Sequence, residues 1–235
     1  MIVSLFGDLA QHRDISIEGP VLSALMAEMS VKPEAVRVAL HRLRKEDWLT
    51  SRKTGRTGRH ALTAKSRRES QHASARIYAA PGDGPDGWQM VMLEHPHRTA
   101  PEKMAKRGFH PLIPRLYIGG AQAKAPKHAL TLGSSQVPDW LRSEIAQGLY
   151  APEYDALARI LTRAQATLDP ADLSALQIAV LRCLIVHNWR RIVLKHPVLP
   201  KGLLPDDWPG HRCHALVDRL LARLPRPAIE TIQPD

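Results

Sequence analysis

The chain has 235 residues, of which 44% are hydrophobic and only 5% aromatic, so its cores must be built mainly from Leu, Val, Ile and Ala. Its formal net charge of +10 favours a nucleic acid, an anionic ligand or a membrane surface as partner, and carries no information about the fold. No stretch reaches the roughly 18 apolar residues that a membrane span requires, and the first residues lack the basic region of a signal peptide.

The first 75 residues carry the pattern of a winged helix-turn-helix. Apolar residues recur at helical spacing from Ile2 to Leu9, and Pro33 suits the first turn of a later helix because its missing N–H is not needed there. Glycines then separate two short β-prone segments. The expected elements are helices at 2–11, 17–29 and 33–47, strands at 48–53 and 59–63 around a turn at 54–58, and a short polar helix from 63 to 75.

Most of the excess charge falls on the third helix and the hairpin. Residues 41–68 contain ten Lys or Arg against two acidic residues, a net charge of +8. In a winged helix the third helix enters the major groove, where Arg can bond guanine edges, and the hairpin (the wing) contacts backbone phosphates. A merely solvated charged face is the alternative interpretation. The predicted DNA-binding residues are Arg37, His41, Arg42, Arg44, Lys45, Arg52, Lys53, Arg56 and Arg59.

The rest of the chain divides into a small mixed region and a helical region. The middle region predicts extended backbone at 77–80, strands at 88–93, 115–118 and 129–132, and a helix at 99–107. The final region predicts helices at 139–147, 152–166, 170–195 and 210–224. The fold class is therefore α+β, in three domains: a winged helix-turn-helix at 1–75, a middle domain at 76–136 and a helical C-terminal domain at 137–235.

The helix expected at 170–195 ends in a basic stretch that allows two interpretations. It is either the solvated outer end of an amphipathic helix or an anion-binding surface for a nucleotide-like effector. The candidate effector-binding residues are Arg182, His187, Arg190 and Arg191.

Other chemistry finds little support in the residues. Cys183 lies in an apolar helical run and is expected to be a buried thiol, and two cysteines do not form a disulfide framework, so a cytoplasmic location is expected. The histidines at 95–97 and 211–214 are best explained as structural or solvated. The chain has no nucleophile elbow and no Gly-rich phosphate loop, so we expect neither a metal nor a cofactor, and no enzyme.

Three separated segments resemble one known family. The first is LFGD at 5–8 followed by AVRVALHRLRKEDWLTSRKTGR at 35–56. The second comprises RIYAAP at 76–81, WQMVML at 88–93 and GFHPLIPRLYIG at 108–119. The third is HNWRRIVLKHPVLPKGLLPDDWPG at 187–210. Together they resemble the PaaX-like, GntR-type transcriptional repressors of phenylacetic acid degradation.

The resemblance implies a more specific function than the residues alone. It implies a ferredoxin-like middle domain, and a homodimer that represses a catabolic operon by binding a palindromic operator in double-stranded DNA. It further implies release by a small acyl-CoA effector, phenylacetyl-CoA in the best-known members. Two positions depart from the family pattern: Asp47 replaces Gly, which accepts positive φ more readily, and His196 replaces Asp.

Two other functions remain as alternatives. A ferredoxin-like middle domain is shared with metal-dependent nucleases, for which the loop after Tyr78 offers Asp83 and Asp86, although both lie among glycines as turn residues do. An RNA-binding module is the second alternative. Duplex RNA would separate it from a DNA reader, because a recognition helix cannot enter the narrow RNA major groove.

Overall fold

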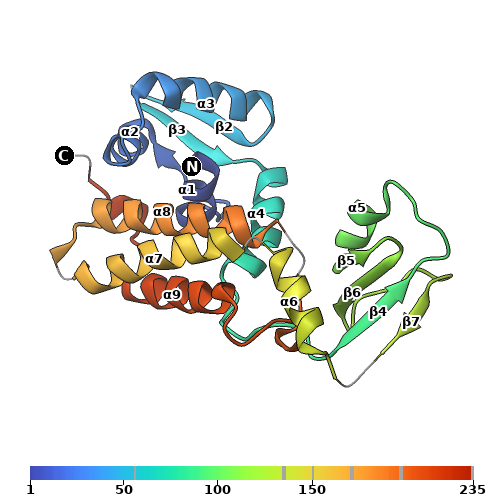
Figure 1. Cartoon of the computed structure of the whole chain (residues 1–235). Coiled ribbons are helices and arrows are strands. Elements are labelled where there is room, and N and C mark those ends of the chain that lie inside the picture. The colour runs from blue at the N-terminus through green and yellow to red at the C-terminus, as the bar shows by residue number, and fades with distance from the viewer. Residues whose placement is uncertain (56, 134–135, 150, 170–171, 196–197, 234–235) are drawn as a thin grey trace. The chain divides into compact units, whose positions relative to one another are not determined.

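The computed structural model describes residues 1–235 except 56, 134–135, 150, 170–171, 196–197 and 234–235. It is an α+β chain with two antiparallel sheets (Figure 1), as predicted. The chain forms two compact units. Unit 1 comprises residues 1–78, 161–190 and 217–235, and unit 2 comprises residues 79–160 and 191–216. This division differs from the three predicted domains, because segments of the predicted C-terminal domain complete unit 1.

The N-terminal part of unit 1 is a winged helix-turn-helix. Its elements are α1 (Ile2–Leu9), β1 (Ile17–Glu18), α2 (Gly19–Glu28), α3 (Pro33–Lys45), β2 (Leu49–Thr54), β3 (Thr57–Leu62) and α4 (Ala64–Ile77). The sheet order is β1-β3-β2. The helix predicted from residue 17 begins two residues later, because Ile17 and Glu18 pair with β3 as a short strand.

Both helices of the helix-turn-helix end in the same way, at a residue with positive φ. Ser30 has φ 57° after α2, and Asp47 has φ 56° after α3. After α3 the Trp48 amide donates to the Leu43 carbonyl at 2.8 Å and the Asp47 amide to the Arg44 carbonyl at 3.1 Å. This is a Schellman motif, so Asp47 occupies the left-handed position that favours glycine.

Helices from the far end of the sequence complete the core of unit 1. They are parts of α7 (Ala151–Thr167), α8 (Ala175–Val193) and α9 (Pro209–Arg223), followed by the short 3-10 helix η3 (Ile229–Thr231). Leu176, Val180 and Cys183 of α8 share one buried cluster with α1, α2 and α3. Burial raises the pKa of Cys183 to about 12, which keeps this thiol protonated and unreactive, as expected.

The start of α8 corrects the prediction that this helix begins near Asp169 and Pro170. The helix begins at Ala175. Gln177 accepts a hydrogen bond from the Ser174 amide at 2.9 Å, and the Ser174 hydroxyl accepts one from the Gln177 amide at 3.2 Å. This reciprocal capping box satisfies two amides of the first turn; Pro170 itself lies outside the described residues.

Unit 2 contains the second sheet and a helical part. The sheet consists of β4 (Trp88–Met92), β5 (Phe109–Ile113), β6 (Leu116–Gly120) and β7 (Leu130–Leu132), and the helical elements are α5 (Ala100–Ala105), α6 (Asp139–Gln147) and the short η2 (Lys201–Leu203). The strand order β5-β6-β4-β7, with all pairs antiparallel, is the ferredoxin-like order. The stretch from 77 to 80, predicted as extended, forms no strand: Ile77 ends α4.

Candidate nucleic-acid interface

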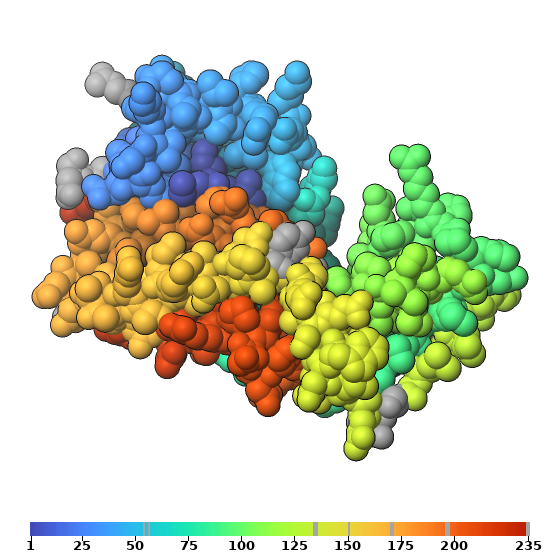
Figure 2. All heavy atoms as spheres, viewed as in Figure 1, coloured from blue at the N-terminus to red at the C-terminus, as the bar shows by residue number. Residues whose placement is uncertain are grey.

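Helix α3 presents a continuous exposed surface on the side opposite the core. Val36 and Leu43 are buried, with Ala39 and Leu40 packed against the same cluster. In Figure 2 the side chains of this segment protrude at the outer edge of unit 1. The predicted residues Arg37, His41, Arg42, Arg44 and Lys45 are all exposed.

The exposed acidic neighbours of α3 hold its arginines only loosely. Arg37 lies 3.3 Å from Glu34 and Arg42 lies 3.7 Å from Glu46, with at least half of each side chain accessible. Exposed pairs of this kind contribute about 0 to 1 kcal/mol. The guanidinium groups of Arg37 and Arg42 can therefore exchange these partners for a phosphate or a guanine edge at little cost.

Sequence reasoning missed one residue on this surface. Val38 is 71% exposed, and it lies one turn before His41 and two turns before Lys45, on the same face of α3. An apolar side chain in that position can contact the methyl group of thymine in the major groove. Its position among the basic residues was the available signal, since helical periodicity places it on their face.

The wing distributes its predicted residues over two faces. Successive residues of a strand point to opposite sides, and the register pairs Arg52 with Arg59 and Lys53 with Gly58. Arg52 and Arg59 therefore share one face. Lys53 points to the other face, the face of Ser51 and His60. Arg56 lies outside the described residues.

The face of His60 is the one that meets α3. His60 and Arg37 line the same cavity of about 290 Å³ beside α2 and α3, and Ser51 bonds the His60 ring at 2.8 Å. Burial, and secondarily the charge of Arg44, lower the pKa of His60, so the ring is neutral at pH 7 and adds no charge to the interface. Arg59, on the opposite face, donates to Glu18 at 2.7 Å.

The candidate effector residues occupy different surroundings. Arg182 is only 5% exposed. Its guanidinium donates hydrogen bonds within the protein, to both carboxylate oxygens of Asp8 at 2.9 Å and to the carbonyls of Leu221 and Leu224. Arg182 therefore offers no free guanidinium to a ligand, which corrects its assignment to an effector surface. The acceptor Asp8 lies 174 residues away, in α1.

The remaining members of that set are closer to a surface. The His187 ring bonds the Ser4 hydroxyl at 3.0 Å, and Arg190 donates to the same hydroxyl at 3.3 Å. The cavity that Arg190 lines measures about 20 Å³, room for about one water molecule. Arg191 is exposed. The sequence placed all four residues on one helix, but only Arg191 is available to an external anion without rearrangement.

The fold and this surface define a winged helix-turn-helix protein whose third helix is basic and exposed. Two family models match the chain: PaaX-like protein over residues 1–66, and PaaX-like protein C-terminal domain over residues 145–233. The chain belongs to the PaaX-like family.

Two relatives are similar over nearly the whole chain. The chain is 28% identical over 250 residues to the "Transcriptional repressor PaaX" of Escherichia coli (strain K12), covering 95% of this chain and 79% of the relative. It also resembles the solved structure of an uncharacterized protein, Rv0674, from Mycobacterium tuberculosis, with a TM-score of 0.54, 19% identity and 94% of each chain covered. The latter similarity concerns the fold alone. Among the described helices, none combines the length and apolarity needed to cross a membrane.

Proposed function

We propose that this protein is a transcriptional repressor that binds duplex DNA through α3 and the wing. The observation that carries the proposal is the exposed surface of α3, where Arg37, Val38, His41, Arg42 and Lys45 are free of the core. Guanidinium, imidazole and apolar groups together are the set that reads base edges in the major groove. The similarity to the E. coli repressor supports the same assignment.

The proposal includes a homodimer on a palindromic operator. A winged helix reads only a few base pairs, and a two-fold symmetric pair places two recognition helices about one helical turn apart, which matches the symmetry of a palindrome. The family resemblance supports a catabolic operon of the phenylacetate type as the target.

An acyl-CoA effector completes the proposed mechanism. Such an effector would bind better to a dimer geometry whose recognition helices no longer match the two half-sites, and so shift the population away from DNA. Phenylacetyl-CoA is the first compound to test. Adding it to the protein–operator complex is expected to increase the dissociation constant for DNA; an unchanged constant at saturating effector contradicts this part alone.

The central test compares two arginines in equivalent exposed ion pairs. Arg42 of α3 pairs with Glu46 at 3.7 Å, with 70% of its side chain exposed, and Arg159 pairs with Asp155 at 3.5 Å, with 67% exposed. Genome-wide footprinting with the purified protein supplies the operator. Arg42→Ala should then weaken operator binding by about 1–3 kcal/mol, the cost typical of a lost base contact, and Arg159→Ala should leave it unchanged. Equal affinities of both variants and the wild type would refute the assignment of α3 as the recognition helix.

The alternative of a nuclease gains no support from its candidate acids. Asp83 accepts a hydrogen bond from the Ala80 amide at 3.1 Å, the role of a turn residue. Among the residues that the structure describes, no three His, Cys, Asp or Glu side chains gather to hold a metal ion. Cleavage of single-stranded RNA by the purified protein, abolished by Asp83→Ala, would overturn the choice of a repressor.

A further inference from the structure

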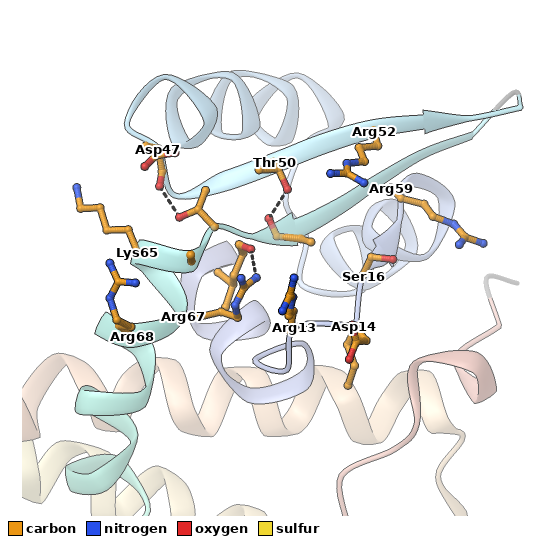
Figure 3. Close-up of a pocket in the computed structure, with 15 residues that line it drawn as sticks. Arg13, Asp14, Ser16, Asp47, Thr50, Arg52, Arg59, Lys65, Arg67 and Arg68 are labelled. Atoms are coloured by element: carbon orange, nitrogen blue, oxygen red, sulfur yellow. Dashed lines mark hydrogen bonds between the residues drawn. The ribbon is translucent and has the colours of Figure 1, made fainter.

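A second basic surface lies on the face of the wing turned away from α3. It is a depression of about 940 Å³, drawn in Figure 3, where α3 lies on one side of the hairpin and Arg13, Arg52 and Arg67 on the other. We call it the basic groove. Six of its lining residues are cationic: Arg13, Arg52, Arg59, Lys65, Arg67 and Arg68.

The cations of the basic groove come from four separate parts of unit 1. Arg13 follows α1, Arg52 lies on β2 and Arg59 on β3, and the other three lie in the first turns of α4. Arg52 and Arg59 are cross-strand partners, so their side chains share this face. Residues up to 55 positions apart in sequence thus converge on one depression, which no single charge run in the sequence indicates.

Few carboxylates neutralise the positive charges of the basic groove. Arg59 pairs with Glu18, and Arg67 donates to the Leu62 carbonyl at 2.6 Å. Only two acids, Asp14 and Asp47, line the depression. Within the described part of the chain, Arg13, Arg52, Lys65 and Arg68 form no ion pair with an acidic side chain. A depression lined by unpaired like charges concentrates positive potential and attracts an anion.

The character of the basic groove favours a polyanion over a small buried ligand. Arg13, Arg52, Lys65 and Arg68 are all exposed, and they lie along an open surface, whereas small-molecule sites are mostly apolar and enclose their ligand. Exposed guanidinium and ammonium groups spread along a surface are the pattern that contacts a phosphate backbone.

The position of the basic groove, on the face of the wing turned away from α3, indicates which DNA strand it fits. With α3 in the major groove, the wing lies over the adjacent minor groove, which is only about 6 Å wide in B-DNA. The two DNA strands that border this minor groove then pass opposite faces of the hairpin. Lys53 and α3 face the strand that separates the two grooves, and the basic groove faces the other strand.

We propose that the basic groove binds the sugar–phosphate backbone of the strand on the far side of the minor groove. The protein would then grip the minor groove from both sides, and Arg13, Lys65 and Arg68 would join the DNA interface. This inference rests on the proposed DNA-binding function and extends it beyond α3 and the α3 side of the wing. It assigns a positioning role, because phosphate contacts carry no sequence information.

The test is a double variant, Arg13→Ala with Arg68→Ala, which removes two exposed cations without touching α3. Arg163→Ala, an exposed arginine of α7 outside the basic groove, is the matched control. The double variant should bind operator and scrambled duplex about tenfold more weakly at low salt, by the same factor for both. The slope of log K against log salt should decrease by about 2, near one unit for each lost phosphate contact.

Hydroxyl-radical footprinting of each strand separately locates the contact. Wild type and Arg163→Ala should protect both strands of the minor groove beside the recognition site, and the double variant should lose protection on the far strand only. Unchanged affinity and salt slope in the double variant, with normal sequence-selective binding by the wild type, would overturn the basic groove and leave the repressor proposal intact. Absence of sequence-selective binding by the wild type would instead overturn the repressor proposal itself.

Discussion

Arg42 on α3 and Arg182 on α8 carry the same side chain in opposite surroundings. The Arg42 side chain is 70% exposed and lies 3.7 Å from the exposed carboxylate of Glu46. The Arg182 side chain is 6% exposed and binds the fully buried carboxylate of Asp8 at 2.9 Å. An arginine in water keeps its donors for a ligand, whereas a buried arginine must satisfy them within the protein. The comparison separates an arginine that is available to a ligand from a structural arginine, which residue type alone does not.

The buried side of the comparison is a network centred on Asp8. Arg182, Tyr78 and Arg226 all donate to its carboxylate, at 2.8 to 3.2 Å. Burial and the Asp8 carboxylate raise the pKa of Tyr78 well above its usual range, so its hydroxyl stays a donor. The network joins α1, the end of α4, α8 and the C-terminal segment within unit 1.

Removing the charge at the centre of this network should have the largest effect. Asp8→Asn leaves the guanidinium of Arg182 buried without a counter-charge, which is expected to lower the free energy of unfolding by about 3–5 kcal/mol. Urea denaturation followed by circular dichroism measures the loss. Glu34→Gln, which breaks the exposed pair with Arg37, is the control and should change stability by less than about 0.5 kcal/mol. Similar small losses in both would contradict the contrast between buried and exposed pairs.

The next effect isolates one hydrogen bond to the buried carboxylate. Tyr78→Phe keeps the ring and removes the hydroxyl that donates to Asp8 at 2.8 Å. Hydrogen bonds to charged groups contribute about 1.5–3 kcal/mol, so the free energy of unfolding should decrease by that amount. Because operator binding is proposed to depend on α3, the folded variant should retain its affinity; a loss of affinity without a loss of stability would place Tyr78 in the DNA interface instead.

On the exposed side, Val38→Ala tests the apolar contact on α3. The side chain is 71% exposed, so its truncation should change stability by less than about 0.5 kcal/mol. Operator affinity should decrease by about 1 kcal/mol, in the range of one or two methyl groups removed from a buried contact. Replacing thymine by uracil at the contacted base pair should produce the same loss in the wild type and none in the variant.

The smallest expected effect concerns Asp47, where backbone and charge act together. Asp47→Gly should raise the free energy of unfolding by about 0.5–1 kcal/mol, because glycine adopts positive φ without the cost that a side chain imposes. Asp47→Asn removes the charge and keeps a side chain. DNA affinity should increase in both variants and stability mainly in the glycine variant; a glycine variant less stable than the wild type would exclude backbone strain at this position.

The sequence predicted the winged helix well because its signals are local. Periodicity located α3, glycines located the wing, and the charge run located the basic residues. The positive φ of Asp47 agrees with the glycine that the family resemblance implied at this position. The capping box of Ser174 and Gln177 was equally local, but the Asp169–Pro170 pair offered a competing start for α8.

The features that the sequence did not reveal are contacts between residues that lie far apart in the sequence. Nothing near Arg182 indicates that its partner is Asp8, 174 residues earlier, and the basic groove joins Arg13 to residues of α4 only after folding. The two faces of the wing were also hidden, because they depend on the register that pairs Arg52 with Arg59. Helical periodicity shows whether a side chain points inward, and only tertiary structure shows what it meets there.

The Asp8 network has a consequence for the order in which the protein is made. Arg226 is synthesised 218 residues after Asp8, and Ile232 belongs to the buried cluster that contains α1 and α3. When synthesis has passed Tyr78, α3 and the wing have been made, but neither partner arginine of Asp8 has. The unit that contains the winged helix is therefore completed by residues made long after α3, and a product interrupted before Arg226 would lack one of the three side chains that donate to Asp8.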